Sequence, residues 1–284
     1  MNSQSHRVER NDAKVDQRTA DAFASSWNNL PSGSVYSAEQ VADWFHPLGS
    51  EDIRGARVLE LGCGNGSLMV HVLGWAPKWL DGLDLGSAVV SAERNLSASG
   101  YANWSLKQED LTTYASGGYD VVYSIGVLHH LKDPKLGFES VVRNTRPGGR
   151  FHCWVYAKEG NAVVIWIVDP IRRIASRLPW WFTKYALATP LVVPYYFYAK
   201  LLAALPRWPI WRSLPLYDYS LWIARREFAF FRHVAFDQLV TPQTAYLDRA
   251  NLESWLAGND RVVSETSYIV MRNGNSWKFG GLVR

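Results

Sequence analysis

The chain has 284 residues and a mass of 32.2 kDa, and 48% of its residues are hydrophobic and 20% charged. This composition excludes a chain that is disordered over most of its length, and the length fits one large domain or a domain with a large insertion. The two cysteines, Cys63 and Cys153, are too few for a disulfide framework or a cysteine metal cluster, which favours a cytoplasmic location. The N-terminus lacks an apolar core, so we expect no signal peptide.

The net charge of +4 is unevenly distributed along the sequence. Residues 161–235 contain ten Lys or Arg and three Asp or Glu, so this segment carries +7 and the remainder −3. The same segment holds 17 of the 39 aromatic residues. A basic and aromatic block of this kind differs from the rest of the chain and needs its own explanation.

The N-terminal residues divide into a polar part and an apolar part. Residues 1–20 are polar and charged, which predicts a flexible tail. Ser37 and Gln40 have the spacing of a capping box, and apolar residues follow at helical spacing. Residues 21–55 are therefore predicted to form a helical lead-in.

The middle of the chain alternates between β-rich and helical stretches. Strands are predicted at Arg57–Leu61, Trp79–Leu85, Trp104–Lys107, Asp120–Ile125 and Arg150–Tyr156, with helices at 66–75, 87–98 and 135–145. This alternation predicts an α/β, Rossmann-like, doubly wound sheet over residues 56–156.

The C-terminal residues 246–284 are predicted to complete this core. A helix is expected at 247–256, followed by strands at 261–271 and 276–283 around Asn273-Gly274, a hairpin turn signal. The five predicted core strands and this antiparallel pair give a seven-stranded mixed sheet.

Residues 157–245 lie between the core and the C-terminal helix and are too many for a loop. Seven prolines between residues 170 and 215 divide this segment, which predicts a set of short helices. Its longest uncharged run, Tyr185–Ala199, is fifteen residues long and contains two prolines. A membrane-spanning helix needs about 20 apolar residues, so this run is predicted not to span.

A glycine-rich loop follows the first predicted strand. The sequence from Glu60 to Gly66 reads Glu-Leu-Gly-Cys-Gly-Asn-Gly, which suits a strand-to-helix turn whose backbone approaches a ligand closely. The third glycine comes one residue earlier than in the dinucleotide-binding fingerprint, which disfavours a nicotinamide dehydrogenase. The carboxylate of Glu60 suits a cationic ligand better than a pyrophosphate.

Two further acidic positions follow the next strands. Asp84 ends the second strand, where a carboxylate next to a glycine loop can accept both hydroxyls of a ribose. Asp110 follows the third strand and could accept the exocyclic amine of adenine, with Leu111 against the ring. Together these positions predict a nucleoside site.

These residues resemble the class I S-adenosylmethionine (SAM)-dependent methyltransferases, in particular small-molecule methyltransferases of ubiquinone and menaquinone biosynthesis. The matching segments are VLELGCGNGSL (58–68), GLDLGSAVVSAERN (82–95), EDL (109–111), YDVVYSIGVLHHLKDP (119–134) and RPGGRF (146–151). The resemblance covers about residues 56–156 and implies an enzyme that uses SAM and releases S-adenosylhomocysteine. The cofactor-binding residues that it implies are Glu60, Gly62, Gly64, Asn65, Gly66, Asp84, Leu85, Asp110, Leu111 and Ile125.

His129 and His130 follow the fourth strand and are the predicted catalytic residues. Methyl transfer depends mainly on holding the acceptor in line, and a base is needed only when the acceptor must lose a proton. Histidine suits that role near neutral pH, with His130 favoured, while a packing role for either ring stays open.

The predicted reaction is methyl transfer to a small organic acceptor at oxygen. One alternative is C-methylation of an aromatic or prenylated, lipid-linked acceptor at a membrane surface. The non-enzyme alternative is a SAM-binding regulatory or interaction protein. Residues from Ser124 onward lack the [Asn/Asp]-Pro-Pro-aromatic motif, which disfavours methylation of nucleic-acid bases, and no metal site is predicted.

Residues 157–245 are predicted to form the acceptor pocket and its lid. The aromatic residues proposed to line it are Trp166, Trp180, Trp181, Tyr195, Tyr196, Trp208, Trp211 and Trp222. Basic residues flank the aromatic cluster at 180–182, the mixture expected at an anionic lipid interface. A further hypothesis is therefore peripheral contact with the inner face of the membrane through residues 160–232, whereas nucleic acid is a disfavoured partner.

Overall fold

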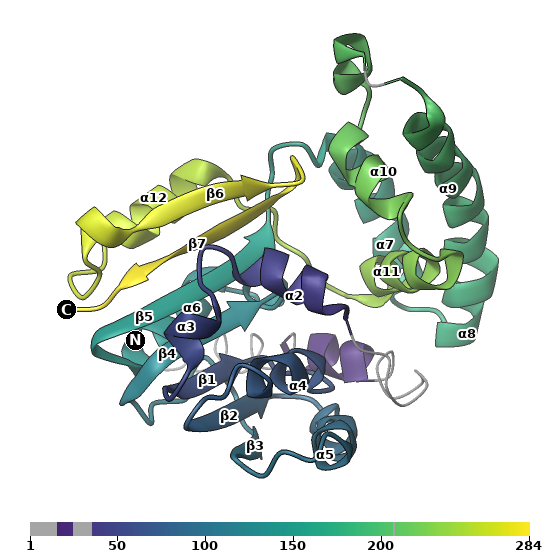
Figure 1. Cartoon of the computed structure of the whole chain (residues 1–284). Coiled ribbons are helices and arrows are strands. Elements are labelled where there is room, and N and C mark those ends of the chain that lie inside the picture. The colour runs from purple at the N-terminus through teal and green to yellow at the C-terminus, as the bar shows by residue number, and fades with distance from the viewer. Residues whose placement is uncertain (1–15, 25–35, 207) are drawn as a thin grey trace, which may run out of the picture.

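Short apolar runs separated by helical stretches build one mixed sheet. The computed structural model describes residues 16–24, 36–206 and 208–284, and its strands are ordered β3-β2-β1-β4-β5-β7-β6. They are β1 (Arg57–Leu61), β2 (Trp79–Asp84), β3 (Trp104–Gln108), β4 (Tyr119–Ile125), β5 (Thr145–Tyr156), β6 (Tyr268–Arg272) and β7 (Ser276–Leu282). β1 to β5 run parallel, and β7 is antiparallel to β5 and β6 (Figure 1). The predicted seven-stranded Rossmann-like sheet is confirmed.

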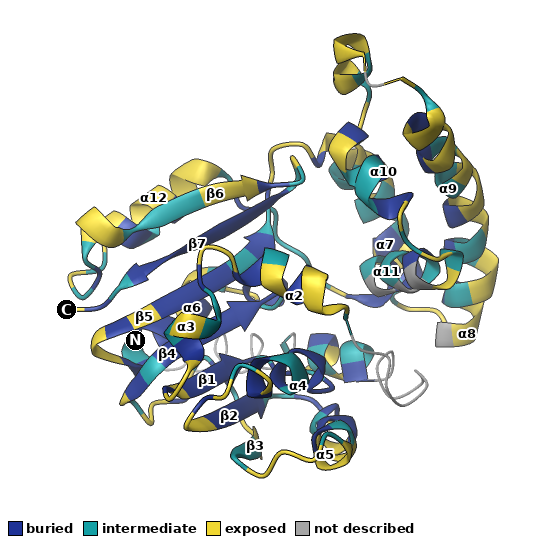
Figure 2. Cartoon of the chain, in the orientation of Figure 1, coloured by how far each residue is buried: buried dark blue, intermediate teal, exposed yellow. Residues whose placement is uncertain are grey.

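Helices cover both faces of the sheet, because successive strand residues point to opposite sides. One face packs on α2 (Ala38–Phe45), α3 (Ser50–Ile53), α4 (Ser67–Leu73) and α5 (Val89–Ala98). The other face packs on α6 (Pro134–Asn144) and α12 (Arg249–Ala257). Neighbouring residues of β1 show the alternation: Val58 belongs to the first cluster and Leu59 to the second. Figure 2 shows the inner strands β1, β2, β4 and β7 as largely buried, whereas the edge strands β3 and β6 are more exposed.

Local signals set most element ends, with two differences from expectation. The capping box of α2 is present, with the Ser37 hydroxyl accepting from the backbone amide of Gln40. The hairpin turn also forms, with positive φ at Asn273 and Gly274. The strand predicted from residue 261 begins only at Tyr268, because a 3-10 turn, η5 (Ser264–Thr266), precedes it. β5 starts earlier than predicted, at Thr145.

The segment 157–245 is largely helical and lies beside the sheet as a separate group (Figure 1); we call it the insert. Its elements are η2 (Val164–Val168), α7 (Asp169–Ala175), α8 (Trp180–Phe182), η3 (Thr183–Ala188), α9 (Thr189–Ala204), η4 (Pro209–Ser213), α10 (Tyr217–Ile223) and α11 (Phe228–Val240).

The prediction that prolines divide the insert into short helices is wrong at Pro190 and Pro194. Pro190 lies in the first turn of α9, where its missing amide costs no hydrogen bond, and Pro194 lies inside the helix. The preceding turn, η3, is a π-helix, so the helix continues from Thr183 to Ala204. An 18-residue stretch of this 22-residue helix has a mean hydropathy of 1.2, and 22% of that stretch is buried. The helix therefore meets the length and composition of a membrane span, which the sequence had been taken to lack.

An N-terminal helix covers residues 16–24. The predicted flexible tail therefore does not reach residue 20, and its residues 1–15 lie outside the described part. Thr19 and Ala24 are buried, and Gly86 packs against the backbone of Ala20. This segment belongs to the folded structure beside the loop after β2.

Candidate active site

One cavity of about 460 Å³ joins the glycine loop to the insert. Its walls come from the ends of β1, β2 and β4, from residues 16–24, from α2 and from helices of the insert. Ligands of open α/β sheets bind beyond the carboxyl ends of the strands, and this cavity lies there. Its volume is in the range of small-molecule sites.

The glycine loop begins where β1 ends. Gly62, Gly64 and Gly66 have φ values of +84°, +52° and +74°, a region that other residues rarely adopt. A Cβ atom on Gly62 would lie 2.4 Å from the side chain of Val127, so this position also needs glycine for space. Gly62, Gly64 and Asn65 line the cavity, whereas Gly66 starts α4 behind it.

Glu60 is a buried carboxylate in the cavity wall. It is 1% exposed, and Oε2 accepts a hydrogen bond from the Tyr123 hydroxyl at 2.7 Å. Burial, together with the nearby Asp84, raises the pKa of Glu60 to about 8, although the hydrogen bond from Tyr123 lowers it. A cationic group in the cavity would favour the charged form, because an opposite charge offsets the cost of burial. The site therefore fits a ligand with an ammonium or sulfonium charge.

Some of the other predicted cofactor residues lie in the cavity wall and others do not. Asp84, Leu85, Leu111 and Ile125 line the cavity. Asp84 already accepts from the amides of Gly64 at 2.9 Å and Gly86 at 2.8 Å, and burial raises its pKa.

Asp110 is absent from the described cavity wall. Its Oδ1 accepts from the backbone amide and hydroxyl of Thr112, at 2.8 and 2.7 Å. This carboxylate oxygen therefore stabilises a local turn. The contact of Asp110 with adenine stays a prediction.

The two histidines differ in their surroundings. His130 lines the cavity, and its Nδ1 lies 3.1 Å from both the Gln243 carbonyl oxygen and the Thr244 hydroxyl. Since a carbonyl only accepts, Nδ1 carries the proton in that bond and Nε2 has a free lone pair. Burial lowers the pKa of His130 to about 3, so the ring is neutral near pH 7.

His129 is fully buried behind the cavity wall. Neither ring nitrogen has a hydrogen-bond partner among the described residues, and the ring lies 4.0 Å from that of Tyr156 and 4.1 Å from that of His130. Burial lowers the pKa of His129 well below its usual value. This placement suits a packing role, so the catalytic hypothesis rests on His130.

Residues 16–24 contribute a wall that the sequence analysis did not predict. Asp16, Thr19, Ala20 and Phe23 line the cavity, and the Phe23 ring lies 4.8 Å from that of His130. Asp16 accepts from the backbone amide of Lys132 at 2.8 Å. The available signal was the four-residue spacing of Thr19 and Phe23, which polar neighbours obscure.

The insert supplies the wall opposite the glycine loop. Of the aromatic residues predicted there, Tyr195 and Trp222 line the cavity. The prediction is wrong for Trp166, Trp181 and Trp208, whose side chains are exposed. Tyr196 and Trp211 are also outside the described wall, and the side chain of Trp180 lies outside the described structure. Aliphatic residues dominate instead: Val163, Val164, Ile167, Val168, Ile171, Leu191, Val192, Val234 and Leu239.

A polar network joins the insert to the end of β5. The buried guanidinium of Arg172 donates to Asp169 at 2.7 Å, to Gln238 and to the Tyr246 hydroxyl at 3.0 Å. Gln238 in turn donates to the hydroxyl of Tyr156 at 2.5 Å. Gln238, Tyr246 and Tyr156 line the cavity, so this network fixes one wall between the two parts of the chain.

Two indole N–H groups provide donors near the cavity. Nε1 of Trp44 and Nε1 of Trp154 are buried without a hydrogen-bond partner among the described residues, and their rings are stacked with centroids 5.9 Å apart. Both residues line the cavity, as does Arg272, which pairs with Asp43 at 2.5 Å. Because both N–H groups are inaccessible, the two rings contribute packing surface to the wall. Within the described ranges no cluster of His, Cys, Asp and Glu could hold a metal ion.

Comparison with known proteins agrees with this geometry. Residues 59–151 match the family model described as "Methyltransferase domain". This part of the chain, about a third of its length, is therefore similar to methyltransferase domains.

Sequence relatives of the methyltransferase domain have different acceptors in their names. The chain is 30% identical over 102 residues to a ubiquinone biosynthesis O-methyltransferase of Xanthomonas oryzae pv. oryzae, covering 35% of this chain and 42% of the relative. It is 28% identical over 144 residues to a tRNA U34 carboxymethyltransferase of Pseudomonas paraeruginosa, covering 49% and 44%. The chain thus spans less than half the length of these relatives.

The methyltransferase domain also has structural neighbours. Magnesium protoporphyrin IX methyltransferase from Synechocystis PCC 6803, solved with bound S-adenosylhomocysteine, gives a TM-score of 0.50 at 13% identity. The match covers 87% of this chain and 81% of that protein. At this identity the likeness concerns the fold.

Proposed function

We propose that the protein transfers the methyl group of SAM to an oxygen atom of a small organic acceptor. The observation that carries this proposal is the continuous cavity that has the glycine loop and Glu60 on one side and the apolar insert on the other. The methyltransferase domain supports the cofactor, whose chemistry is the donation of a methyl group from a sulfonium.

The residues around the glycine loop would hold the cofactor. Glu60 offers a buried carboxylate to the amino group, and Asp84 lies where the ribose hydroxyls are expected. Leu111 and Ile125 would supply apolar contacts for the adenine ring of the cofactor. Asp16, Thr19 and Phe23 from residues 16–24 would exclude water from this side, which strengthens the electrostatic contacts inside.

The acceptor would occupy the arm of the cavity between His130 and the insert. The free Nε2 of His130 can take the proton of an acceptor hydroxyl, and the Gln243 carbonyl fixes the tautomer that leaves this nitrogen free. The proton of an acceptor hydroxyl becomes strongly acidic as its oxygen bonds to the methyl group, so a base as weak as His130 can accept it at that point. A phenol is the acceptor class we favour.

Thermal unfolding with excess ligand tests the cofactor. A ligand at 100 times its dissociation constant adds about 2.7 kcal/mol to stability, which raises the midpoint by several degrees. We expect shifts with SAM and S-adenosylhomocysteine and none with NAD. The absence of a shift with both sulfur ligands would reject the proposal.

Single substitutions then test the base. His130→Gln should abolish turnover of an identified phenolic acceptor while leaving the SAM shift unchanged. His129→Gln serves as the matched control and should retain most of its turnover. Wild-type turnover in His130→Gln would remove the assigned base and favour C-methylation or a base-free reaction.

A further inference from the structure

The long helix of the insert is apolar on both sides. Its inward residues, among them Val192, Ala199 and Leu202, are buried against other insert helices. Its outward residues Tyr185, Pro190, Val193, Phe197 and Leu201 follow at intervals of about four and are also apolar, and Trp181 of the preceding α8 continues this spacing. We call these six residues the outer stripe. A helix in contact with water normally carries polar residues on this side.

The outer stripe is strongly exposed. Phe197 is 71% exposed, Leu201 61% and Trp181 55%. Figure 2 shows the corresponding side of α9 as exposed. Contiguous apolar surface of this kind marks a contact with another apolar phase.

The cavity reaches the same group of helices. Val163, Ile167 and Leu191 line the cavity and are also 37%, 55% and 42% exposed. Residues that both line the cavity and are exposed at the protein surface form the rim of its opening. The opening is therefore bordered by exposed aliphatic side chains of η2 and α9, which suits the passage of a hydrocarbon group.

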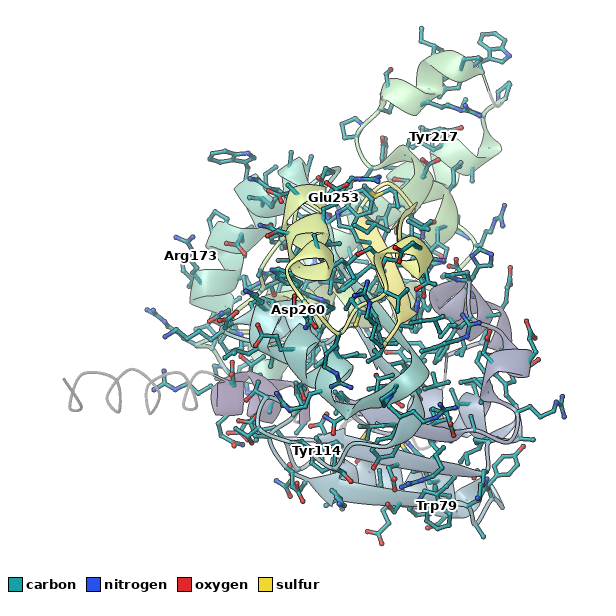
Figure 3. The ribbon with its side chains drawn as sticks, turned by 90° about the vertical axis from the view of Figure 1, so that its left-hand side faces the viewer. Trp79, Tyr114, Arg173, Tyr217, Glu253 and Asp260 are labelled. Carbon is teal, nitrogen blue, oxygen red and sulfur yellow. The ribbon has the colours of Figure 1, made fainter. Side chains whose placement is uncertain are left out.

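The positive charge of the insert indicates which partner fits the outer stripe. The insert carries +7 between residues 161 and 235, and Arg173 is 78% exposed. Figure 3 shows Arg173 projecting outward. A second copy of the insert would bring like charges together, whereas an anionic bilayer is complementary to both the charge and the apolar stripe.

Hydrogen bonds from one side of α9 to the rest of the insert determine which side of the helix is free to contact a bilayer. The Tyr195 hydroxyl bonds to Ser220, the Tyr196 hydroxyl donates to the Arg226 carbonyl, and Lys200 donates to the Ala224 carbonyl. These contacts tie the inward side of α9 to α10 and the segment after it. Because that side is occupied by protein, the helix meets lipid along one side only, as interfacial helices do.

We propose that the outer stripe binds the surface of an anionic membrane and that the acceptor is a lipid-soluble molecule entering through the rim of Val163, Ile167 and Leu191. This proposal deepens the proposed function by naming the acceptor class. The polar head of the acceptor would lie near His130, and its hydrocarbon tail would lie between the aliphatic residues of the insert.

Vesicle flotation of the full chain tests the membrane contact. We expect the protein to float with vesicles of phosphatidylcholine mixed with phosphatidylglycerol, and to float less with phosphatidylcholine alone. The double variant Trp181→Ser with Phe197→Ser should weaken flotation at least about tenfold, since both lose apolar contact. Arg173→Gln should weaken it about fivefold at low salt, from about 1 kcal/mol per basic residue.

A matched control uses exposed apolar residues of the core. Val90 and Leu136 are 56% and 47% exposed, so Val90→Ser with Leu136→Ser removes similar surface away from the insert. This variant should float like the native protein. Native protein that stays in the soluble fraction with both kinds of vesicle would overturn the proposal, and so would equal loss in the control variant.

Two additional measurements keep the outcomes distinct. The SAM-induced thermal shift of the stripe variant should equal that of the native protein, because the outer stripe is remote from the glycine loop in sequence and faces outward. Flotation without any SAM shift would reject the proposed function and leave the membrane contact standing. A dimer in size-exclusion chromatography that the stripe variant loses, without flotation, would assign the stripe to a second copy and overturn the proposal.

Discussion

The core over residues 57–156 and the insert over residues 157–245 differ in how completely they bury their apolar side chains. The core places its strands between two helical layers, so its apolar residues are enclosed on both sides. The insert encloses only one side of its longest helix and exposes aromatic and aliphatic groups on the other. The difference indicates that the core is stable through its own packing, whereas the insert surface is shaped for contact with something apolar.

The largest expected effect concerns the hydrogen-bond network of Arg172, which connects the insert to the core. Arg172→Met removes a buried cation that binds Gln238 and Asp169; Asp169 keeps its pair with Arg173, so the main loss is at the buried Gln238 contacts. Breaking a buried pair in this way costs about 3–5 kcal/mol. We expect the insert to become sensitive to limited proteolysis while the core resists. Equal protection of both regions would show that the insert does not depend on this network.

The second prediction concerns the core alone. Glu60→Gln keeps an acceptor for the Tyr123 hydroxyl but removes the buried charge. Loss of this charge should weaken SAM binding about 100-fold, equivalent to about 2.7 kcal/mol. Titration calorimetry measures this, and binding within threefold of native would contradict the assigned role.

The same substitution should also raise the stability of the unliganded protein. The pKa of Glu60 in the folded state, about 8, is above its unfolded value of 4.5. The folded form therefore holds its proton more tightly, and the cost of the charge appears as pH rises from about 4.5 to 8. At pH 8, unfolding by denaturant should show the variant to be more stable than native, and at pH 4 the two should be equal.

A matched pair on one helix sharpens the comparison within the insert. Leu202 is 4% exposed and its neighbour Leu201 is 61% exposed. Leu202→Ala should cost about 2–4 kcal/mol, since it leaves a cavity among α9 and its neighbours. Leu201→Ala should change stability by less than about 0.5 kcal/mol. Denaturant unfolding measures both, and equal costs would mean that Leu201 is covered in solution.

The smallest expected effect is the pH dependence of SAM affinity. Because a cationic ligand favours the charged form of Glu60, binding should release a proton below pH 8. Affinity should increase about fivefold between pH 7 and pH 8 and then level off. Calorimetry in two buffers of different ionisation enthalpy detects the proton, and its absence at pH 7 would contradict a raised pKa.

The sequence predicted the core well because its signals are local. The strands end at glycine or at an acid, and the capping box at Ser37 and the turn at Asn273 act within a few residues. The paired roles of His129 and His130 could not be separated in this way. Their difference depends on Gln243, which is more than a hundred residues away in the chain.

The insert was predicted less well, since its structure depends on packing between distant segments. Prolines indicated breaks, but the π turn before Pro190 allows the helix to continue. The aromatic residues were assigned to the cavity by type, while the structure exposes Trp166 and Trp208. Residue type alone does not tell whether an aromatic ring faces a ligand, a core or a surface.

The helix over residues 16–24 covers the cavity beside the glycine loop, while the aliphatic rim opens at the insert, on the other side of His130. A ligand held at the glycine loop would therefore lie beneath this helix. Its release should be slowed by the contacts that hold the helix in place, such as the hydrogen bond from the Lys132 amide to Asp16.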